Sequence, residues 1–236
     1  MVPSGSGDDD RRGPLDRLEV LDRQEAEITS ELAHLEILTS RGLLSLLWHG
    51  PRTAESVVLL CSGGGGGLLG PANGLYQDLG TVFAHHGIGS LRVGYRRAGH
   101  LDLCLLDVLV AADLATRSGA KRFVLVGHSF GGAVAVRSAV ILGRWTAGVV
   151  TLATQSTGCE VADRLAGVPL LLLHGDRDEL IPVMASGLVH QLAGGHGELA
   201  VLPGCSHTMV EADHEIRRRL LPWIPARLAE HERRPL

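Results

Sequence analysis

The sequence predicts an α/β protein in which helices cover both faces of a mostly parallel sheet of about eight strands. Short apolar runs, typical of strands buried on both faces, alternate with longer segments that have helical periodicity. Such alternation is typical of parallel sheets, because the connection between two parallel strands usually carries a helix. With 236 residues, of which 45% are hydrophobic, the chain is long enough for one compact core.

The first expected elements are two antiparallel strands at the edge of the sheet. Leu35 and Ile37 alternate with polar residues, residues 39–42 have the composition of a hairpin turn, and residues 43–48 continue as a strand. Buried strands are then expected over residues 57–60, 89–93, 123–126, 149–152, 170–173 and 199–202. Helices are expected over residues 73–85, 103–116, 130–142, 183–192 and 209 to about 229, the last interrupted by Pro222 and Pro225.

Residues 1–30 are expected to form a flexible N-terminal tail, followed by one domain over residues 31–236. The first 14 residues are Ser, Gly, Pro, Asp and Arg for the most part, and such segments bury too little apolar surface to repay the entropy of ordering. Leu15, Leu18 and Leu21 recur at helical spacing among charged residues, so this stretch is either a short amphipathic helix or more of the tail.

Composition and charge argue against several classes of partner. The chain has 22 Lys and Arg against 26 Asp and Glu, and its aromatic residues are 3 Phe, 3 Trp and 2 Tyr. Neither a basic surface for nucleic acid nor an aromatic stacking platform is expected from these counts. Four widely spaced cysteines without a C-x-x-C pair indicate neither a disulfide framework nor a metal site, and no cofactor is expected: Cys61, Cys104, Cys159 and Cys205.

The hydrophobic pattern does not predict a membrane protein. No apolar run reaches the 18 or more residues needed to span a bilayer, and the first residues lack the apolar region of a signal peptide. We therefore expect a cytoplasmic protein that does not bind membranes. The sequence leaves its oligomeric state open.

A sharp bend between a strand and a helix is predicted at Ser129. The strand at 123–126 runs into Gly127-His-Ser129-Phe-Gly131, a G-x-S-x-G motif, and the apolar helix at 130–142 follows. Such a bend holds the serine in a strained conformation and leaves no room for a Cβ two positions before or after it. The start of the helix would also offer unpaired N–H groups to a developing oxyanion. The alternative is a Gly/Ser turn with a buried hydroxyl.

An acid and a base are expected at the same edge of the sheet as Ser129. Asp176 and Asp178 follow the buried strand at 170–173, and His207 follows the strand at 199–202. A nucleophilic serine needs a base, and the base needs a carboxylate to orient it. The chain order Ser, Asp, His is the one expected for this kind of bend.

These motifs resemble those of the α/β-hydrolase-fold serine hydrolases, over roughly residues 31–228. The family's acid motif, H-G-x-x-D-x-x-V-P, is matched from His174 to Pro182 with Ile181 in place of Val, which selects Asp178 over Asp176. Its G-x-x-H motif is matched at Gly204 and His207. The resemblance implies a serine hydrolase in which Ser129 is the nucleophile, His207 the base and Asp178 the orienting acid.

The glycine run at 63–67 has two interpretations. The resemblance places an oxyanion loop here, with the N–H of Gly63, or of Gly64 if the register slips, acting beside the N–H of Phe130. The family's usual H-G at the start of this loop is replaced by Cys61-Ser62. The run also fits a dinucleotide-binding G-x-G-x-x-G at residues 65–70, although the next strand ends with arginines and no acidic residue.

The short segment between the strands at 149–152 and 170–173 leaves no room for a large lid. By this criterion the chain resembles the lidless, dienelactone-hydrolase-like members and the carboxylesterases and thioesterases. Gly64, Tyr95 and Arg96 are candidate substrate contacts; the last two either anchor a substrate anion or form a solvated basic loop.

Together these observations predict a metal-free serine hydrolase. Its expected substrate is a small-molecule or carrier-bound carboxylic ester or thioester, cleaved through an acyl-enzyme on Ser129. The main alternative is a member of the same fold that carries out non-hydrolytic chemistry, such as epimerisation or cyclisation, or only binds a ligand. A less favoured alternative is an NADP-binding protein.

Overall fold

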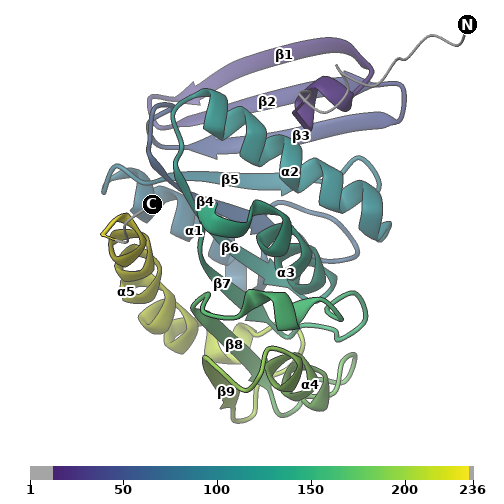
Figure 1. Ribbon diagram of the computed structural model, residues 1–236, viewed down its shortest axis with the longest axis vertical. Helices are drawn as coiled ribbons and strands as arrows, with labels where there is room; N and C mark the ends of the chain where they lie inside the picture. Colours follow the sequence, from purple (N-terminus) through teal and green to yellow (C-terminus); the bar gives the residue numbers. More distant parts are fainter. Residues whose placement is uncertain (1–12, 234–236) are drawn as a thin grey trace, which may run out of the picture.

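The computed structural model describes residues 13–233, and these form one sheet of nine strands (Figure 1). The strand order is β1-β2-β3-β5-β4-β6-β7-β8-β9; pairing is antiparallel from β1 to β5 and parallel from β5 to β9. The strands are Val20–Thr29 (β1), Leu32–Thr39 (β2), Gly42–His49 (β3), Ser56–Cys61 (β4), Gly89–Gly94 (β5), Arg122–His128 (β6), Thr146–Leu152 (β7), Leu170–Gly175 (β8) and Glu198–Leu202 (β9). The predicted fold class is confirmed.

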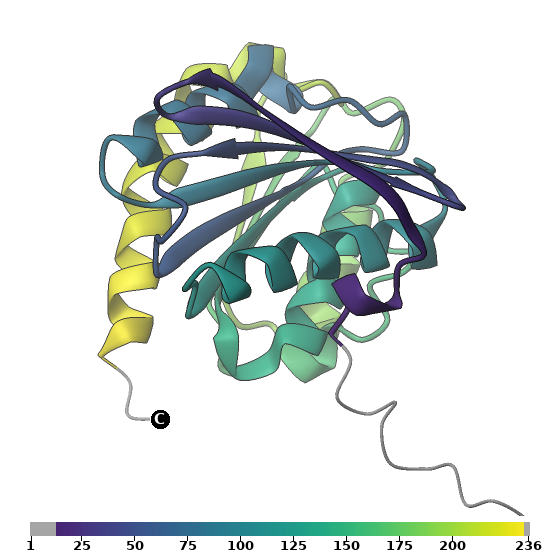
Figure 2. The same ribbon diagram turned by 90° about the horizontal axis from the view of Figure 1, so that it is seen from above.

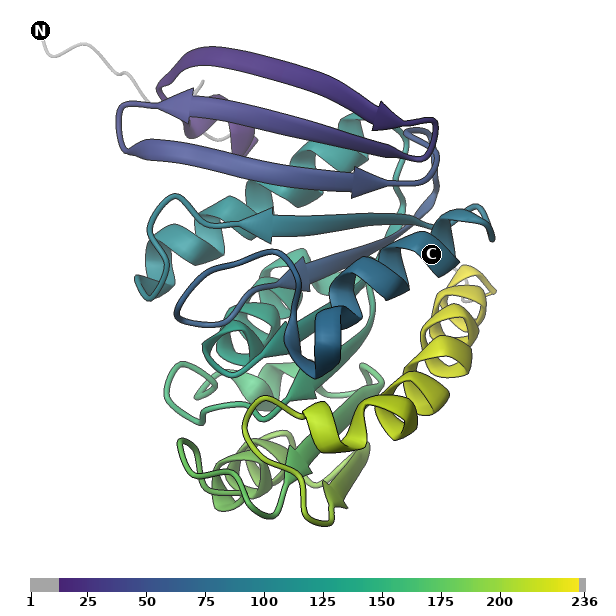
Figure 3. The ribbon, with the colours of Figure 1, turned by 180° about the vertical axis from the view of Figure 1, so that it is seen from behind.

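Helices pack on both faces of the twisted sheet (Figure 2). Those on one face, in front in Figure 1, are Leu101–Arg117 (α2), Phe130–Leu142 (α3) and Met184–Leu192 (α4). Those on the other face, in front in Figure 3, are Pro71–Ala84 (α1) and Asp213–Glu232 (α5). Each face has its own apolar core, because alternate side chains of the central strands point to opposite sides of the sheet.

The N-terminal region differs from the prediction. Residues 20–29 are neither tail nor helix but strand β1, which pairs with β2 along its length. Among the described residues before β1, Leu15–Arg17 forms a helical turn, of the 3-10 type. Every residue of β1 is exposed, so the strand shows no alternation of apolar and polar residues, and backbone pairing with β2 holds it in place. Residues 1–12 of the expected tail lie outside the described residues.

Helix α5 also differs, because it runs through Pro222 and Pro225 without interruption. Each proline removes one backbone hydrogen bond and costs about 3 kcal/mol in a helix interior. Against this cost, four side chains at intervals of four residues are buried in the core, and each contributes about 1.5–3 kcal/mol: Ile216, Leu220, Ile224 and Leu228. Burial of this face outweighs the lost hydrogen bonds.

The carboxyl ends of β4, β6, β8 and β9 lie at one edge of the sheet, and the loops after them carry the predicted site residues. The segment after β7 forms only a one-turn 3-10 helix, Ala162–Leu165, before β8 begins, so no large lid covers this edge. No helix within residues 13–233 combines the length and apolar character needed to cross a membrane.

Candidate functional site

The bend at Ser129 has the geometry that its glycines predict. Ser129 has φ 57° and ψ −123°, a strained combination for a residue with a side chain, and it joins β6 directly to α3. A Cβ on Gly127 would lie 2.0 Å from the carbonyl oxygen of Gly131. A Cβ on Gly131 would lie 2.3 Å from the carbonyl oxygen of Cys61. Both glycines are required because the backbone of the bend passes this closely against itself and against β4.

Asp178 and His207 are in direct contact. His207 Nδ1 lies 2.7 Å from Asp178 Oδ2, while the other carboxylate oxygen accepts the N–H groups of Leu180 and Ile181 at 2.9 and 2.8 Å. The Asp178 side chain is fully buried and the His207 side chain is 12% exposed. Burial alone would raise the pKa of Asp178, but the hydrogen bonds from Ile181, His207 and Leu180 hold it below its usual value.

Asp176 plays a different part from Asp178. Its Oδ1 accepts the N–H of Gly204 at 2.6 Å, so it joins the loop after β8 to the loop after β9 at the exposed surface. Of the two carboxylates that follow β8, Asp178 is therefore the one that contacts His207.

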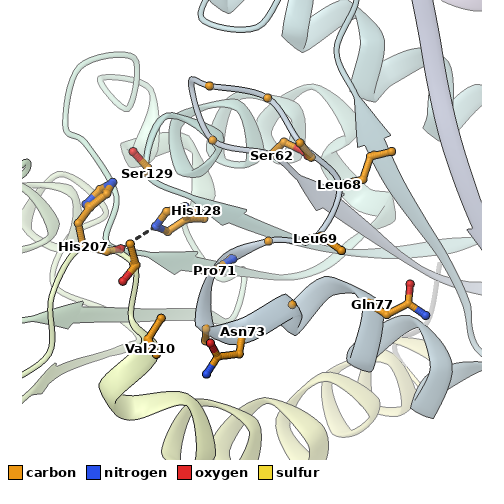
Figure 4. A pocket seen from close by; sticks show the side chains of 18 of the residues that line it. Ser62, Leu68, Leu69, Pro71, Asn73, Gln77, His128, Ser129, His207 and Val210 are labelled. Carbon is orange, nitrogen blue, oxygen red and sulfur yellow. Dashed lines mark hydrogen bonds between the residues drawn. The ribbon is translucent and has the colours of Figure 1, made fainter.

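Ser129 and His207 line one end of the same pocket, where their side chains lie next to each other (Figure 4). No hydrogen bond joins these two described residues. Hydrogen bonds between a nucleophile and its base are often long without substrate and shorten when substrate binds. The arrangement therefore brings a hydroxyl, an imidazole and an ionised carboxylate together in the predicted order.

His128, which precedes Ser129, contacts the same loop and was not singled out by the sequence. Its Nε2 donates a hydrogen bond to the backbone carbonyl of His207 at 2.9 Å, and the two rings lie 4.9 Å apart between centroids, tilted by 45° (Figure 4). Burial lowers the pKa of His128 to about 4, so the ring is neutral at pH 7 and carries one N–H. Its place inside the G-x-S-x-G motif was the available sequence signal.

His174 contacts the same carboxylate oxygen of Asp178 as His207 does. Its Nε2 lies 2.9 Å from the carbonyl oxygen of Ile181 and 3.2 Å from Asp178 Oδ2, and its Nδ1 lies 2.7 Å from the hydroxyl of Ser186. The side chain is fully buried. The histidine of the acid motif thus holds the loop that presents Asp178.

The glycine loop passes close to Ser129. A Cβ on Gly63 would lie 3.9 Å from the Cβ of Ser129, and one on Gly64 would lie 3.5 Å from the Cβ of Phe130. Phe130 is the first residue of α3, so its N–H has no partner within the helix. Gly63, Gly64 and Phe130 are therefore all brought to the bend, as the sequence predicts.

The departure at Cys61-Ser62 has a structural explanation. The Ser62 hydroxyl lies 2.9 Å from the carbonyl oxygen of Val93 on β5 and also contacts the carbonyl oxygen of Gly67 at the far end of the loop. The Tyr76 hydroxyl donates to the carbonyl of Cys61 at 2.9 Å. A serine at position 62 thus ties the glycine loop to the sheet.

Tyr95 and Arg96 do not line the pocket that contains Ser129. Arg96 Nε lies 2.5 Å from Asp107 Oδ1, and the two side chains are 2% and 0% exposed, so this arginine forms a buried ion pair with α2. The Tyr95 ring packs edge-on against Phe130, with the centroids 6.4 Å apart. Asp107 holds Arg96 and the core takes up Tyr95, so neither of these candidate substrate contacts reaches this pocket. A dinucleotide bound at the glycine loop would need an arginine after β5 for its phosphate, and Arg96 is not free to serve because it pairs with Asp107.

The pocket has a volume of about 830 Å³ and lies between the glycine loop and the start of α1 (Figure 4). Besides Ser129 and His207 it is lined by glycines 63–67, by apolar residues of both walls and by Asn73, Gln77 and Asp78. Within residues 13–233, His, Cys, Asp and Glu side chains nowhere gather in a group of three or more that could hold a metal ion.

Solved structures with the same fold support the assignment of the architecture. Est1E from Butyrivibrio proteoclasticus matches with a TM-score of 0.69 and 16% identity, over 83% of this chain and 99% of that one. Dienelactone hydrolase from Anabaena variabilis matches with a TM-score of 0.68 and 17% identity, over 87% and 99%. XC6422 from Xanthomonas campestris, described as an α/β serine hydrolase without a lid, matches with a TM-score of 0.62 and 18% identity, over 85% and 98%.

The sequence itself matches a known family. No curated protein sequence shows significant similarity to the chain. The family model described as phospholipase/carboxylesterase matches residues 103–221, which is half of the chain and includes Ser129, Asp178 and His207. The chain therefore has the α/β-hydrolase fold and belongs to the phospholipase/carboxylesterase family.

Proposed function

We propose that the protein is a serine hydrolase that cleaves a carboxylic ester or thioester through an acyl-enzyme on Ser129. The single observation that carries this proposal is the buried, ionised Asp178 bonded to His207 at one end of the pocket that exposes Ser129. A carboxylate in this position holds the imidazole in the tautomer that leaves Nε2 free to accept a proton. The family membership supports the same reaction class.

In the acylation step, Ser129 Oγ attacks the substrate carbonyl while His207 Nε2 takes the hydroxyl proton. The tetrahedral intermediate collapses, the bond to the leaving alcohol or thiol breaks, and that group takes the proton from His207. Water then repeats the sequence on the acyl-enzyme, which releases the carboxylic acid and restores the Ser129 hydroxyl. Asp178 stays ionised throughout and stabilises the imidazolium that forms in each half-reaction.

The negative charge on the intermediate needs donors fixed beside Ser129. The N–H of Phe130 is free at the start of α3, and its position benefits from the positive end of the helix dipole. We assign the second donor to the N–H of Gly63, which the Ser62 hydroxyl helps to hold against the bend. Gly64 then borders the substrate.

Labelling with a fluorophosphonate, which modifies activated serine hydroxyls, tests the nucleophile. We expect one label per chain, located at Ser129 by peptide mass spectrometry. Ser129→Ala should lose the label and at least about a thousandfold of the rate, because only the oxyanion donors and substrate binding remain to it.

Ser206→Ala is the matched control, because Ser206 lies beside His207 and bonds Glu211 on the same exposed loop. It should keep both the label and the rate. A label on Ser206 or Ser62, or near-normal turnover of any substrate by Ser129→Ala, would reject the proposed function in favour of non-hydrolytic chemistry.

A further inference from the structure

The pocket beside Ser129, here called the cleft, offers almost no charge to a substrate. Among the described residues that line it, Asp78 is the one with a formal charge at pH 7, and Arg217 pairs with that carboxylate at 2.5 Å. His128, whose pKa burial lowers to about 4, is neutral. None of the described residues that line the cleft is a lysine or an arginine, so these residues offer no cation to compensate for removing a phosphate or carboxylate from water.

Two arginines lie behind the walls of the cleft, and both donate hydrogen bonds to backbone carbonyl groups of these walls. Arg92 is buried and donates to the carbonyl of Leu68 at 3.2 Å. Arg217 donates to the carbonyl of Ala72 at 3.0 Å in addition to its bond with Asp78. These guanidinium groups hold the walls in place and do not line the space between them.

Acidic residues next to the rim of the cleft also disfavour an anionic substrate. Glu179 precedes Leu180 and Glu211 follows Val210, and both Leu180 and Val210 line the cleft. Glu179 and Glu211 are exposed carboxylates on the two loops that carry Asp178 and His207. An anionic substrate group would approach these like charges, and among the described residues of the two loops Arg177, exposed between Asp176 and Asp178, is the cation.

The cleft has an apolar, open region. Leu68, Leu69, Pro71 and Ala72 line it, and the Leu69 side chain is 63% exposed. An apolar substrate group would remove this surface from water. The volume of about 830 Å³ is that of pockets that bury drug-sized ligands, whereas an acetyl group would leave most of it empty.

Besides the paired Asp78, the cleft is lined by two uncharged amide side chains, those of Asn73 and Gln77. The Asn73 amide donates to Asp213 and the Gln77 amide to Thr81, which leaves the side-chain oxygen of each without a partner among the described residues. Amide oxygens accept hydrogen bonds from hydroxyl groups and do not balance a negative charge.

We propose, on the basis of the proposed function, that the substrate is an uncharged ester whose larger group is apolar and fills this cleft. Esters or thioesters on anionic carriers, and esters that bring a phosphate or carboxylate into the cleft, are poor substrates. The lining of the cleft thus favours one class of ester among those that the proposed reaction could cleave.

Simple esters of different size test the apolar part, with acid release followed by titration. The wild-type protein should hydrolyse ethyl octanoate or octyl acetate with a kcat/KM at least about tenfold above that for ethyl acetate, since each methylene in an apolar pocket changes the rate about tenfold or more. The second comparison uses the preferred eight-carbon chain with a carboxylate at its free end. Its kcat/KM should be at least about tenfold below that of the compound in which this carboxylate is a neutral methyl ester.

Substitutions in the cleft link this preference to its walls. Gly65 lines the cleft, a Cβ there meets nothing within 4 Å, and its φ is not positive, so Gly65→Leu adds bulk without backbone strain. This variant should lower the ratio of kcat/KM for the long-chain ester to kcat/KM for ethyl acetate at least about tenfold. Gly187→Leu on α4, where a Cβ also meets nothing, is the matched control and should leave the ratio unchanged.

Leu69→Asn gives a second, surface-level probe in case Gly65→Leu does not fold. It should reduce the same ratio, whereas Met184→Asn should not, because Met184 is 77% exposed but lies outside the cleft. Equal rates for short and long esters, a preference for the carboxylate, or equal effects of the cleft and control variants would overturn the substrate class. Absence of all Ser129-dependent ester hydrolysis would instead overturn the proposed function.

Discussion

His128 holds His207 through the backbone, with 2.9 Å between His128 Nε2 and the carbonyl oxygen of His207. Strand β6, which ends at His128, thereby supports the loop that carries the base, from 79 residues away in the chain. Because burial keeps the ring of His128 neutral, it donates this bond without placing a second positive charge beside His207.

Replacing His128 should lower the rate without removing either the nucleophile or the base. His128→Phe keeps a ring against His207 but loses the donor, so we expect kcat to fall about 10- to 100-fold, because a shift of about 1 Å in a catalytic group costs about a hundredfold. His128→Gln keeps an N–H donor and should retain most of kcat. The measurement is kcat and KM on one ester, and labelling of Ser129 checks that the bend at Ser129 is intact.

The ranking of the two variants decides the role of His128. If Phe retains more of kcat than Gln, ring packing is the function of this side chain, and if both lose the same amount, the ring and the donor are both needed. If neither changes kcat, the loop holds His207 without the hydrogen bond.

The acid is assigned by comparing the two aspartates that follow β8. Asp178→Asn should fold but lower kcat by about 10⁴, because an amide cannot stabilise the imidazolium or select the required tautomer. Asp176→Asn keeps an oxygen for the N–H of Gly204 and should lose less than about tenfold. Steady-state kinetics of both variants, with circular dichroism as the folding control, give the answer; the reverse order would assign the acid to Asp176.

The sequence predicts best where one local pattern determines the structure. The helix after Ser129 begins and ends at the predicted residues, because apolar runs and the glycines at 127 and 131 leave the backbone few alternatives. Strand β1 was missed for the opposite reason. All of its residues are exposed, and its one partner is the edge of β2, so its sequence has no periodic signal.

Side-chain partners were harder to predict than elements. Arg96 was either a candidate substrate contact or part of a solvated loop, but its side chain is buried against Asp107, eleven residues further along and on α2. The contact between His128 and His207 likewise depends on how β6 and β9 are placed in one sheet. Such contacts follow from tertiary packing, which a single sequence does not encode in any local spacing.

The stability of the protein should decrease in mildly acidic solution because of two histidines. Burial lowers the pKa of both His49 and His128 to about 4, and the charge of Arg92 lowers that of His49 further. The unfolded chain binds a proton on each at a pKa of about 6.5, so it holds more protons than the folded state between about pH 6.5 and 4. The free energy of unfolding should therefore fall as the pH falls, by up to about 1.4 kcal/mol per pH unit for each histidine.

Urea unfolding at several pH values between 7 and 4.5 measures this slope. His49→Met removes one of the two groups from the buried face of β3 and should reduce the slope by about 1.4 kcal/mol per pH unit. The carboxylates with lowered pKa values, such as Glu215 at about 2, lose their contribution mainly as the pH falls below about 4.5, where the unfolded chain takes up protons on them, so the slope between pH 7 and 5 reports chiefly on the histidines. An unchanged slope in His49→Met would mean that His49 is protonated in the folded protein.

Arg96 distinguishes a structural ion pair from a substrate contact. Arg96→Met leaves the Asp107 carboxylate buried without a partner, so we expect the free energy of unfolding to fall by about 3–5 kcal/mol. The double variant Arg96→Met/Asp107→Leu removes both charges and should be more stable than the single variant, since no buried charge remains uncompensated. Urea unfolding of the wild type, both single variants and the double variant gives the coupling between the two residues. Kinetics on a carboxylate-bearing ester and its neutral methyl ester complete the test: if Arg96 contacts substrate, its loss lowers kcat/KM for the charged ester alone, whereas the buried pair predicts the same ratio of the two esters in every folded variant.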